Sequence, residues 1–193
     1  MINNYNAMIN SIQTYGGFYV ARYEMGVKDS TVVISKLGVT PADSFDETTE
    51  FWYGLYSKAK TYVTSSVKSS MIWGSQYDAI LHFALAGLDK TKVIETTNGN
   101  HGKAPTKTGE YKGSDCINNI YDLEGNGREW TLEASGMLGN DNLDCYRVVR
   151  GGGFNDDDDE MPPISRYGIM ADAGGKDSFS EWEYSTRVTL YIR

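Results

Sequence analysis

The stretch NIYDLEGNGREWT, Asn119–Thr131, carries the most specific local signal in the sequence. A turn signal at Gly125–Gly127 joins two apolar, aromatic pieces, and the carboxylates of Asp122 and Glu129 flank it. Two carboxylates at short spacing, with backbone carbonyls that the glycines allow to turn inward, suit an oxygen-ligated ion such as Ca²⁺. The alternative is a turn whose carboxylates face water or pair with Arg128. From these residues alone both interpretations stay open.

Downstream, the block RVVRGG at Arg147–Gly152 leads into an acidic run at Asn155–Glu160. The chain then closes on Thr186–Ile192, which is typical of a strand. Between these ordered ends, Gly153–Tyr184 shows no helical or strand period and contains nine acidic and two basic residues, nearly all of the chain's net charge of −8. A long segment of this kind is usually functional or disordered, and its aromatic content argues against disorder.

Upstream, apolar spacing predicts helices over Asn3–Thr14 and Thr48–Tyr62, and a further helix that begins at Gly74 or Ser75. The expected caps are Asn3 or Asn4 for the first helix and Thr48 or Thr49 for the second. Aromatic and β-branched residues predict strands at Phe18–Glu24 and Val32–Ile34. The expected inward residues of the second helix are Phe51, Leu55, Ala59 and Tyr62, and those of the third are Ile80, Phe83 and Ala84.

The length of 193 residues favours one domain over residues 1–193, and the 12% aromatic residues and 21 glycines favour short strands and turns. No apolar run approaches the roughly 20 residues of a membrane span. The N-terminus, Met1–Tyr5, lacks a basic region, so we expect either no signal peptide or the C-terminal part of a longer chain. The pI near 4.8 argues against nucleic acid as a partner, because phosphates bind clusters of Lys and Arg.

The order Gly-Asn-x-x-Glu-Trp-Thr at Gly125–Thr131, then Arg147–Gly152, then Arg187–Leu190 resembles the formylglycine-generating-enzyme, or sulfatase-modifying-factor, family. Phe18–Glu24 resembles the opening strand of that family. The resemblance implies an α+β, C-type-lectin-like fold with short antiparallel strands, two main helices and long loops. It also implies that the calcium turn of the family maps onto Asp122, Gly125, Gly127 and Glu129.

The departures from the family concern its redox chemistry. The oxidase members hold copper with a cysteine pair near the C-terminus, but Ser165–Thr186 contains no cysteine, and iron-dependent relatives need a histidine cluster where this chain has only His82 and His101. We therefore expect no redox metal, and we interpret both histidines as structural or loop residues. Cys116 and Cys145 are expected to be buried reduced thiols, with a disulfide as the alternative.

One branch of the family fits this departure: the variable proteins of diversity-generating retroelements, found in phages and bacteria. The resemblance implies a non-catalytic display protein that binds a protein or cell-surface ligand, on a phage virion or a bacterial surface, through residues of about 153–184. Adenine-directed mutation of Asn codons does not yield Met, Lys, Glu or Trp, so such positions need other codons or are fixed. The rival interpretations are an oxidoreductase relative and a structural tail or adhesin module. The predicted ligand-binding residues are Phe154, Asn155, Asp156, Asp157, Asp158, Tyr167, Ile169, Met170, Asp172, Lys176, Phe179, Glu181, Trp182 and Tyr184, with Asp156–Asp159 exposed.

Overall fold

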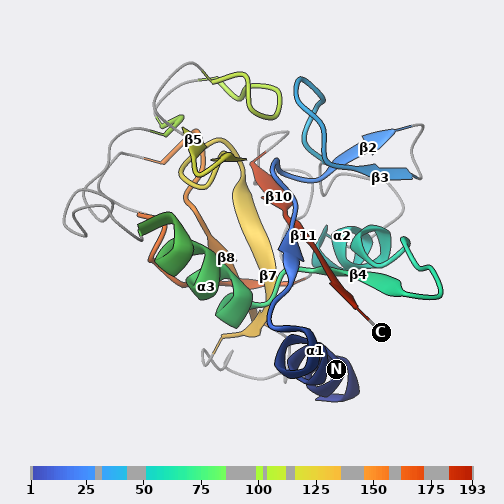
Figure 1. Cartoon of the computed structure of the whole chain (residues 1–193). Coiled ribbons are helices and arrows are strands. Elements are labelled where there is room, and N and C mark those ends of the chain that lie inside the picture. The colour runs from blue at the N-terminus through green and yellow to red at the C-terminus, as the bar shows by residue number, and fades with distance from the viewer. Residues whose placement is uncertain are drawn as a thin grey trace.

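The protein is a mixed α+β structure with three helices and several small sheets among the residues that the computed structural model describes (Figure 1). Those residues are 2–28, 32–42, 51–85, 99–101, 104–111, 116–135, 146–156, 162–171 and 183–192. The mixed α+β class predicted from the sequence is confirmed, whereas the C-type-lectin-like assignment stays a prediction. No described helix combines the length and the apolar character that crossing a membrane requires.

Helix α1 spans Ile2–Tyr15 and buries Met8 and Ser11 against the sheet. Gly16, at a φ of 80°, ends the helix by donating its N–H to the Ile12 carbonyl oxygen at 2.8 Å. A glycine in this left-handed conformation is the usual helix stop. The predicted helix is confirmed, but the predicted caps at its N-terminus are wrong, because α1 already includes those two asparagines.

Helix α2 spans Phe51–Ala59, so the predicted helix is too long at its C-terminal end, and Tyr62 beyond it is 56% exposed. Leu55 and Ala59 are buried as predicted, and the proposed caps lie outside the described residues. The indole of Trp52 stacks on Tyr56 with ring centroids 4.9 Å apart. The Nε1 of this indole also donates to the Thr131 carbonyl at 2.8 Å, which fastens α2 to the sheet.

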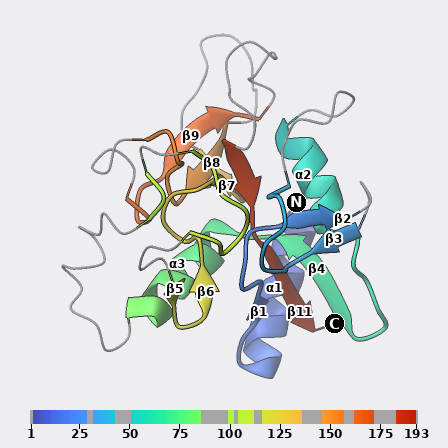
Figure 2. The same ribbon diagram turned by 90° about the horizontal axis from the view of Figure 1, so that it is seen from above.

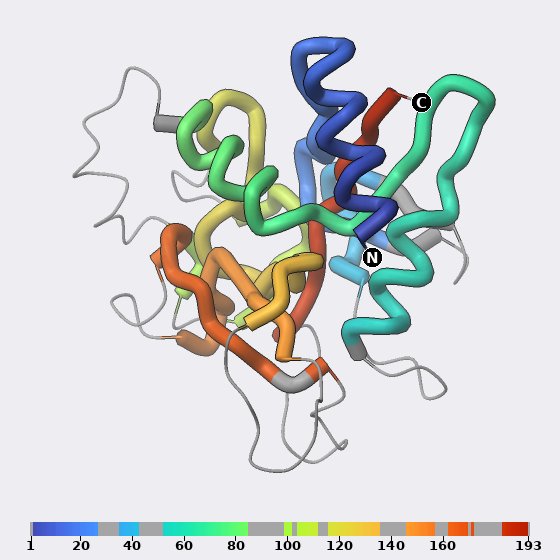
Figure 3. The backbone as a smooth tube through the Cα atoms, turned by 90° about the horizontal axis from the view of Figure 1, so that it is seen from below, coloured from blue at the N-terminus to red at the C-terminus, as the bar shows by residue number. Residues whose placement is uncertain are grey.

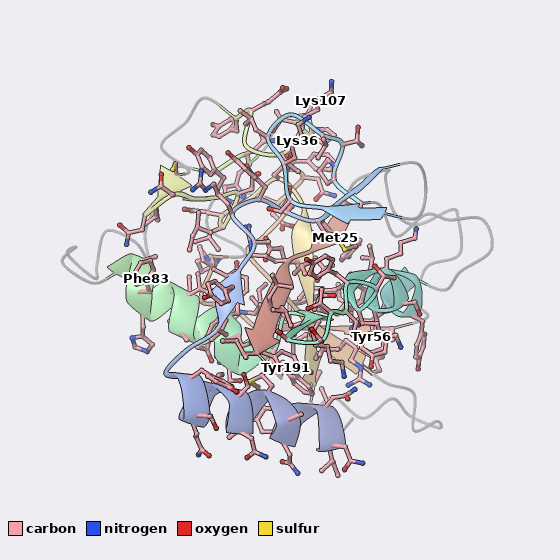
Figure 4. The ribbon with its side chains drawn as sticks, turned by 45° about the vertical axis from the view of Figure 1, so that its right-hand side comes forward. Met25, Lys36, Tyr56, Phe83, Lys107 and Tyr191 are labelled. Atoms are coloured by element: carbon pink, nitrogen blue, oxygen red, sulfur yellow. The ribbon has the colours of Figure 1, made fainter. Side chains whose placement is uncertain are left out.

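Helix α3 spans Gly74–Leu85, and its inward face consists of Tyr77, Ile80, Leu81 and Ala84. Phe83 was predicted to face inward, but it is 58% exposed and lies at the rim of the molecule (Figure 4). The helical period explains this error, because the buried stripe follows a spacing of three and four residues that passes over position 83.

The first sheet is three-stranded, in the order β1-β11-β4, and all of its pairs are antiparallel. Its strands are β1 (Tyr19–Val20), β11 (Val188–Ile192) and β4 (Val67–Met71). The strand predicted over Phe18–Glu24 is therefore wrong in length. Tyr191 of β11 and Met25, which follows β1, are 3% and 0% exposed and lie in the interior, where Figure 4 labels them.

The second sheet is four-stranded, in the order β10-β7-β8-β9, and it carries the C-terminal segment. Its strands are β10 (Tyr184–Thr186), β7 (Arg128–Ala134), β8 (Tyr146–Arg150) and β9 (Tyr167–Met170). β7 runs parallel to β10 and antiparallel to β8. The closing strand predicted from the sequence thus serves both sheets, because it divides at Arg187 into β10 and β11. Figure 2 shows the two sheets beside each other.

Helices α2 and α3 lie on opposite sides of β7 (Figures 1 and 2). The larger core cluster includes Trp52, Trp130, Leu132 and Val149, and a smaller one forms around Ile72, Tyr77 and Leu123. Two short antiparallel strand pairs complete the described part of the structure. They are β2 (Gly26–Lys28) with β3 (Val32–Ile34), which confirms the strand predicted there, and β5 (Cys116–Ile117) with β6 (Ile120–Tyr121).

Candidate functional site

The turn that precedes β7 is buried rather than exposed to solvent. Asp122, Gly125 and Asn126 have φ values of 55°, 75° and 63°, which is the left-handed region. A Cβ atom on Gly125 would lie 2.6 Å from the backbone nitrogen of Asn100, so glycine is required for this close approach. The Asn126 side chain accepts the Thr106 N–H at 2.9 Å. The turn is therefore a packed part of the scaffold.

Both carboxylates that flank the turn are buried, at 2% exposure for Asp122 and 0% for Glu129. Glu129 is ion-paired with Arg187, whose Nη2 lies 2.6 Å from its Oε1. Asp122 accepts the Gly109 N–H at 2.6 Å. Of the alternatives left open by the sequence, pairing of Glu129 with Arg128 is wrong.

Arg187 connects four segments from one fully buried position. Besides Glu129, its Nη1 donates to the Ala21 carbonyl at 3.0 Å and its Nη2 donates to the Tyr121 carbonyl at 2.7 Å. A second Nη2 bond reaches the Asp122 carbonyl at 3.1 Å. This guanidinium thus joins the end of β1, the β6 region and β7 to the start of β11.

A third carboxylate, Glu24, lies in the same interior and is 0% exposed. It accepts hydrogen bonds from Asn126 Nδ2 at 2.7 Å and from the Gly127 N–H at 3.1 Å. Burial raises the pKa of Glu24 well above its ordinary value, and the charges of Asp122 and Glu129 raise it further. The sequence offered Glu24 only as the end of a predicted strand, and its position beside the turn depends on tertiary structure.

These carboxylates do not fit a calcium cage as they stand, because Ca²⁺ takes about six to eight oxygen ligands at short range. Both Glu129 oxygens face the Arg187 guanidinium, and the oxygens of Glu24 accept hydrogen bonds from Asn126 and Gly127. Within the described part of the chain, no group of three or more His, Cys, Asp or Glu residues could hold a metal ion. Calcium binding at this turn stays a prediction, and it would require displacement of Arg187.

Arg128, at the start of β7, connects the two ends of the C-terminal segment. It forms ion pairs with Asp156 and with Glu183, and its Nε lies 3.0 Å from Asp156 Oδ2. The same Oδ2 accepts the Gly153 N–H at 2.6 Å. Asp156 is 5% exposed, so the expectation that it is a solvated member of an acidic run is wrong. We call Arg128, Asp156 and Glu183 the arginine clamp.

Tyr184 completes this region from β10. Its ring stacks on Trp130 with centroids 5.5 Å apart, and its hydroxyl accepts from Arg128 Nη1 at 3.2 Å. Burial raises the pKa of Tyr184 to about 12. This residue therefore belongs to the interior that supports the segment.

Two further arginines, Arg150 and Arg166, hold the middle of the C-terminal segment in place. Arg150 is fully buried, lies over the Tyr77 ring at 4.7 Å and donates to Asp78 Oδ1 at 3.0 Å. Arg166, from the segment itself, pairs with Asp78 and with Glu133 of β7, and its Nε lies 3.1 Å from Glu133 Oε1. These contacts hold the residues before β9 against α3 and β7.

The predicted ligand-binding residues that the structure describes differ in their exposure. Phe154, Asp156 and Tyr184 are buried, Asn155 and Tyr167 are exposed, and Ile169 is half-buried against the larger core. Met170 lies in β9. Ile164, which is 51% exposed, was missed because it lies in a stretch without periodicity. The predictions that fall outside the described residues are Asp157, Asp158, Asp172, Lys176, Phe179, Glu181 and Trp182.

The histidine and cysteine residues lie in different settings. His82 is exposed on α3, whereas His101 is buried, with Nδ1 at 3.3 Å from the Gly153 carbonyl oxygen and Nε2 at 3.7 Å from Glu124 Oε1. His101 thus contacts the start of the C-terminal segment. Cys116 is a free, exposed thiol, so the expectation of a buried thiol is wrong for this residue, and Cys145 lies outside the described residues.

Comparison with known proteins gives a distant structural similarity. No protein-family model and no curated protein matches this sequence. Among solved structures, variable protein 1 of Treponema denticola is similar, with a TM-score of 0.40 and 15% sequence identity. The similarity covers 64% of this chain and 48% of that protein, so the chain spans about half of the length of its structural neighbour.

Proposed function

We propose that this protein is a non-catalytic binding protein whose ligand face is built on residues 153–184. The ligand is a protein or a cell-surface molecule. The four-stranded sheet supplies a hydrogen-bonded platform, and two large side chains of the segment, Tyr167 at the start of β9 and Ile164 just before this strand, are 56% and 51% exposed. Exposed aromatic and aliphatic side chains on a fixed support are the usual anchors of protein interfaces.

The observation that carries this proposal is the division of labour within the segment. Asp156 and Glu183 are buried in the arginine clamp, whereas Asn155 and Tyr167 lie at the surface. Because the contacts of the arginine clamp are internal, exposed side chains such as Asn155 and Tyr167 are free to change without loss of this support. The exposure of Tyr167 also favours a binding surface over a purely structural module.

We further propose that a diversity-generating retroelement varies this face, on a phage virion or a bacterial surface. Glu183 supports this idea in a specific way. Adenine-directed mutation of an Asn codon does not produce glutamate, and the carboxylate of Glu183 is bound to Arg128 in the interior. A fixed codon is expected at such a position, while Asn155 and Tyr167 are residues that this mutation does produce.

Sequencing the gene across many isolates tests the proposal. We expect substitutions to concentrate in codons 153–184, at exposed positions such as 155 and 167, while Asp156 and Glu183 stay constant. A reverse transcriptase gene and a near-copy of these codons should lie nearby. Substitutions spread evenly over the chain, or found equally at Asp156 and Glu183, would overturn the proposal.

Tolerance to substitution gives a second, biochemical test. Variants Asn155→Ser and Tyr167→Ser should fold as the wild type does, whereas Asp156→Asn and Glu183→Gln should be destabilised, as measured by urea denaturation. The alternative of a redox enzyme predicts stoichiometric copper or iron in the purified protein, measured by elemental analysis. Stoichiometric redox metal would count against a non-catalytic role.

A further inference from the structure

A cavity of about 500 Å³ opens at the end of the four-stranded sheet. Its lining residues come mainly from the first turns of α1 and α3 and the last residues of β7, and these three parts of the backbone lie close together in Figure 3. Tyr5, Trp73 and Leu132 contribute an apolar wall, and the Tyr5 and Trp73 rings contact each other edge to face at 4.9 Å. The charged side chains in the wall are those of Asp78, Glu133, Arg147 and Arg166.

Arg166 reaches across this wall from the C-terminal segment. Its guanidinium bonds to Asp78 and to Glu133 Oε1, yet the side chain stays 43% exposed. Behind it, fully buried Arg150 holds the other oxygen of Asp78 at 3.0 Å. The second Glu133 oxygen, Oε2, is buried and makes no hydrogen bond with a described residue, and it lies 4.0 Å from Arg150 Nη1.

Asp78 and Glu133 thus face the buried guanidinium of Arg150 from the interior and the exposed guanidinium of Arg166 from the surface. A third guanidinium, that of Arg147 in β8, also lines the cavity and lies over the Trp52 ring at 4.5 Å. Without Arg166, Asp78 and Glu133 would lose the guanidinium that pairs with both of them from the surface, beside an apolar wall. Exposed ion pairs contribute little net stability, so a competing cation has little to overcome at Arg166.

We propose that this cavity is a binding site for a basic side chain, an arginine of a protein ligand, which takes the place of Arg166 on Asp78 and Glu133. The guanidinium of the ligand would bond to the two carboxylates in the planar geometry that arginine favours. Its aliphatic stem would lie against Trp73 and Leu132. The acidic character of the chain, −8 overall, suits the approach of a basic partner.

The site extends the proposed function and rests on it in one respect, the variation that we propose for position 166. Asp78 and Glu133 belong to α3 and β7, outside the segment that we propose to vary, whereas Arg166 belongs to that segment. The residue at position 166 therefore decides whether the constant carboxylates are closed by the protein itself or open to the ligand. Exchange at this one position would switch the preference for basic ligands on or off.

The test uses nuclear magnetic resonance titration of the full chain with N-acetyl-L-arginine amide as the probe. The variant Arg166→Ser should bind the probe with shifts at Trp73 and Leu132. It should bind more tightly than the wild type by roughly fivefold, because the probe no longer competes with two exposed ion pairs. N-acetyl-L-citrulline amide, which has the same shape without the charge, should cause no such shifts.

Three controls separate the possible outcomes. Arg22→Ser removes an exposed arginine elsewhere and should behave as the wild type does. Adding Asp78→Asn to Arg166→Ser should abolish binding. If Arg166→Ser does not fold, Arg166→Gln keeps the length of the side chain and should give the same result.

Equal affinity of Arg166→Ser and the wild type, equal binding of the citrulline probe, or shifts that map away from the cavity would each overturn the inference. Such a failure would leave the proposed function standing, because the variation of codons 153–184 is measured independently. Conversely, an invariant segment would overturn the proposed function and leave the cavity to be tested by the titration alone.

Discussion

Replacing Arg128 by methionine should lower the free energy of unfolding by about 3–5 kcal/mol, because it leaves two buried carboxylates without a counter-charge. The side chain of Arg128 is 13% exposed, and those of Asp156 and Glu183 are 5% and 7% exposed. Water therefore compensates little for the lost ion pairs. Methionine keeps much of the apolar volume of the stem, so the loss reports mainly on charge.

The cation–π contact adds to this effect. The Arg128 guanidinium lies 5.3 Å from the centroid of the Tyr184 ring, a geometry that contributes roughly 0.5–1 kcal/mol. For a chain of this length, a loss of 3–5 kcal/mol corresponds to a fall of roughly 6–20 °C in Tm. Urea denaturation followed by circular dichroism measures the free energy, and a thermal melt measures the Tm.

The matched control is Arg166→Met, which removes an arginine with two carboxylate partners at 43% exposure. That variant should lose at most about 1 kcal/mol, because its ion pairs are exposed to solvent. A double-mutant cycle between Arg128→Met and Asp156→Asn isolates the coupling of that pair. The reasoning would be refuted if Arg128→Met lost less than about 1 kcal/mol, as the exposed control does.

Three further predictions concern the buried carboxylates near the turn. Burial raises the pKa of Glu24 above its ordinary value of 4.5, so this carboxyl group loses its proton at a lower pH in the unfolded state than in the folded state. The free energy of unfolding should therefore fall as pH rises from 4.5 through the raised pKa. Glu24→Gln should remove this part of the pH dependence in urea titrations, and an unchanged pH profile would contradict the prediction. Arg187→Met should destabilise the protein by more than Glu129→Gln does. The Arg187 variant leaves the Glu129 carboxylate unpaired beside two other buried carboxylates, at a cost of about 3–5 kcal/mol. The reverse order in denaturant midpoints would show that Arg187 is not the main counter-charge. A calcium site at the turn predicts a Tm several degrees higher in Ca²⁺ than in chelator, whereas an undisturbed Arg187–Glu129 pair predicts equal melts, so one comparison decides between them.

Local patterns in the sequence predicted whether a segment forms a helix, a strand or a turn better than they predicted which segments it contacts. Helical spacing located α1 and α3, and Gly16, a glycine in the left-handed region, ends α1. The Gly-Asn-Gly turn also had the left-handed backbone that such residues indicate. These features depend on neighbours within a few residues, so the chain itself contains the information.

The ion pairs and hydrogen bonds of the candidate site could not be predicted from such local patterns. The acidic run suggested a solvated Asp156, but Arg128, 28 residues away, draws it into the interior. Glu24 meets Asn126 across 102 residues of sequence. Charge and polarity in a sequence do not say which opposite charge will arrive, and only packing brings such partners together.

The amino-acid sequence by itself determined the α+β class, the positions of the helices, the tight turn before β7 and the concentration of negative charge near the C-terminus. Only the tertiary structure decided that Asp156 and Glu183 are internal anchors, that Glu129 pairs with Arg187, and that Tyr167 and Ile164 remain exposed. The physical reason is distance along the chain. Periodicity and turn chemistry act over a few residues, whereas burial of a charged group depends on a partner that the fold delivers from elsewhere.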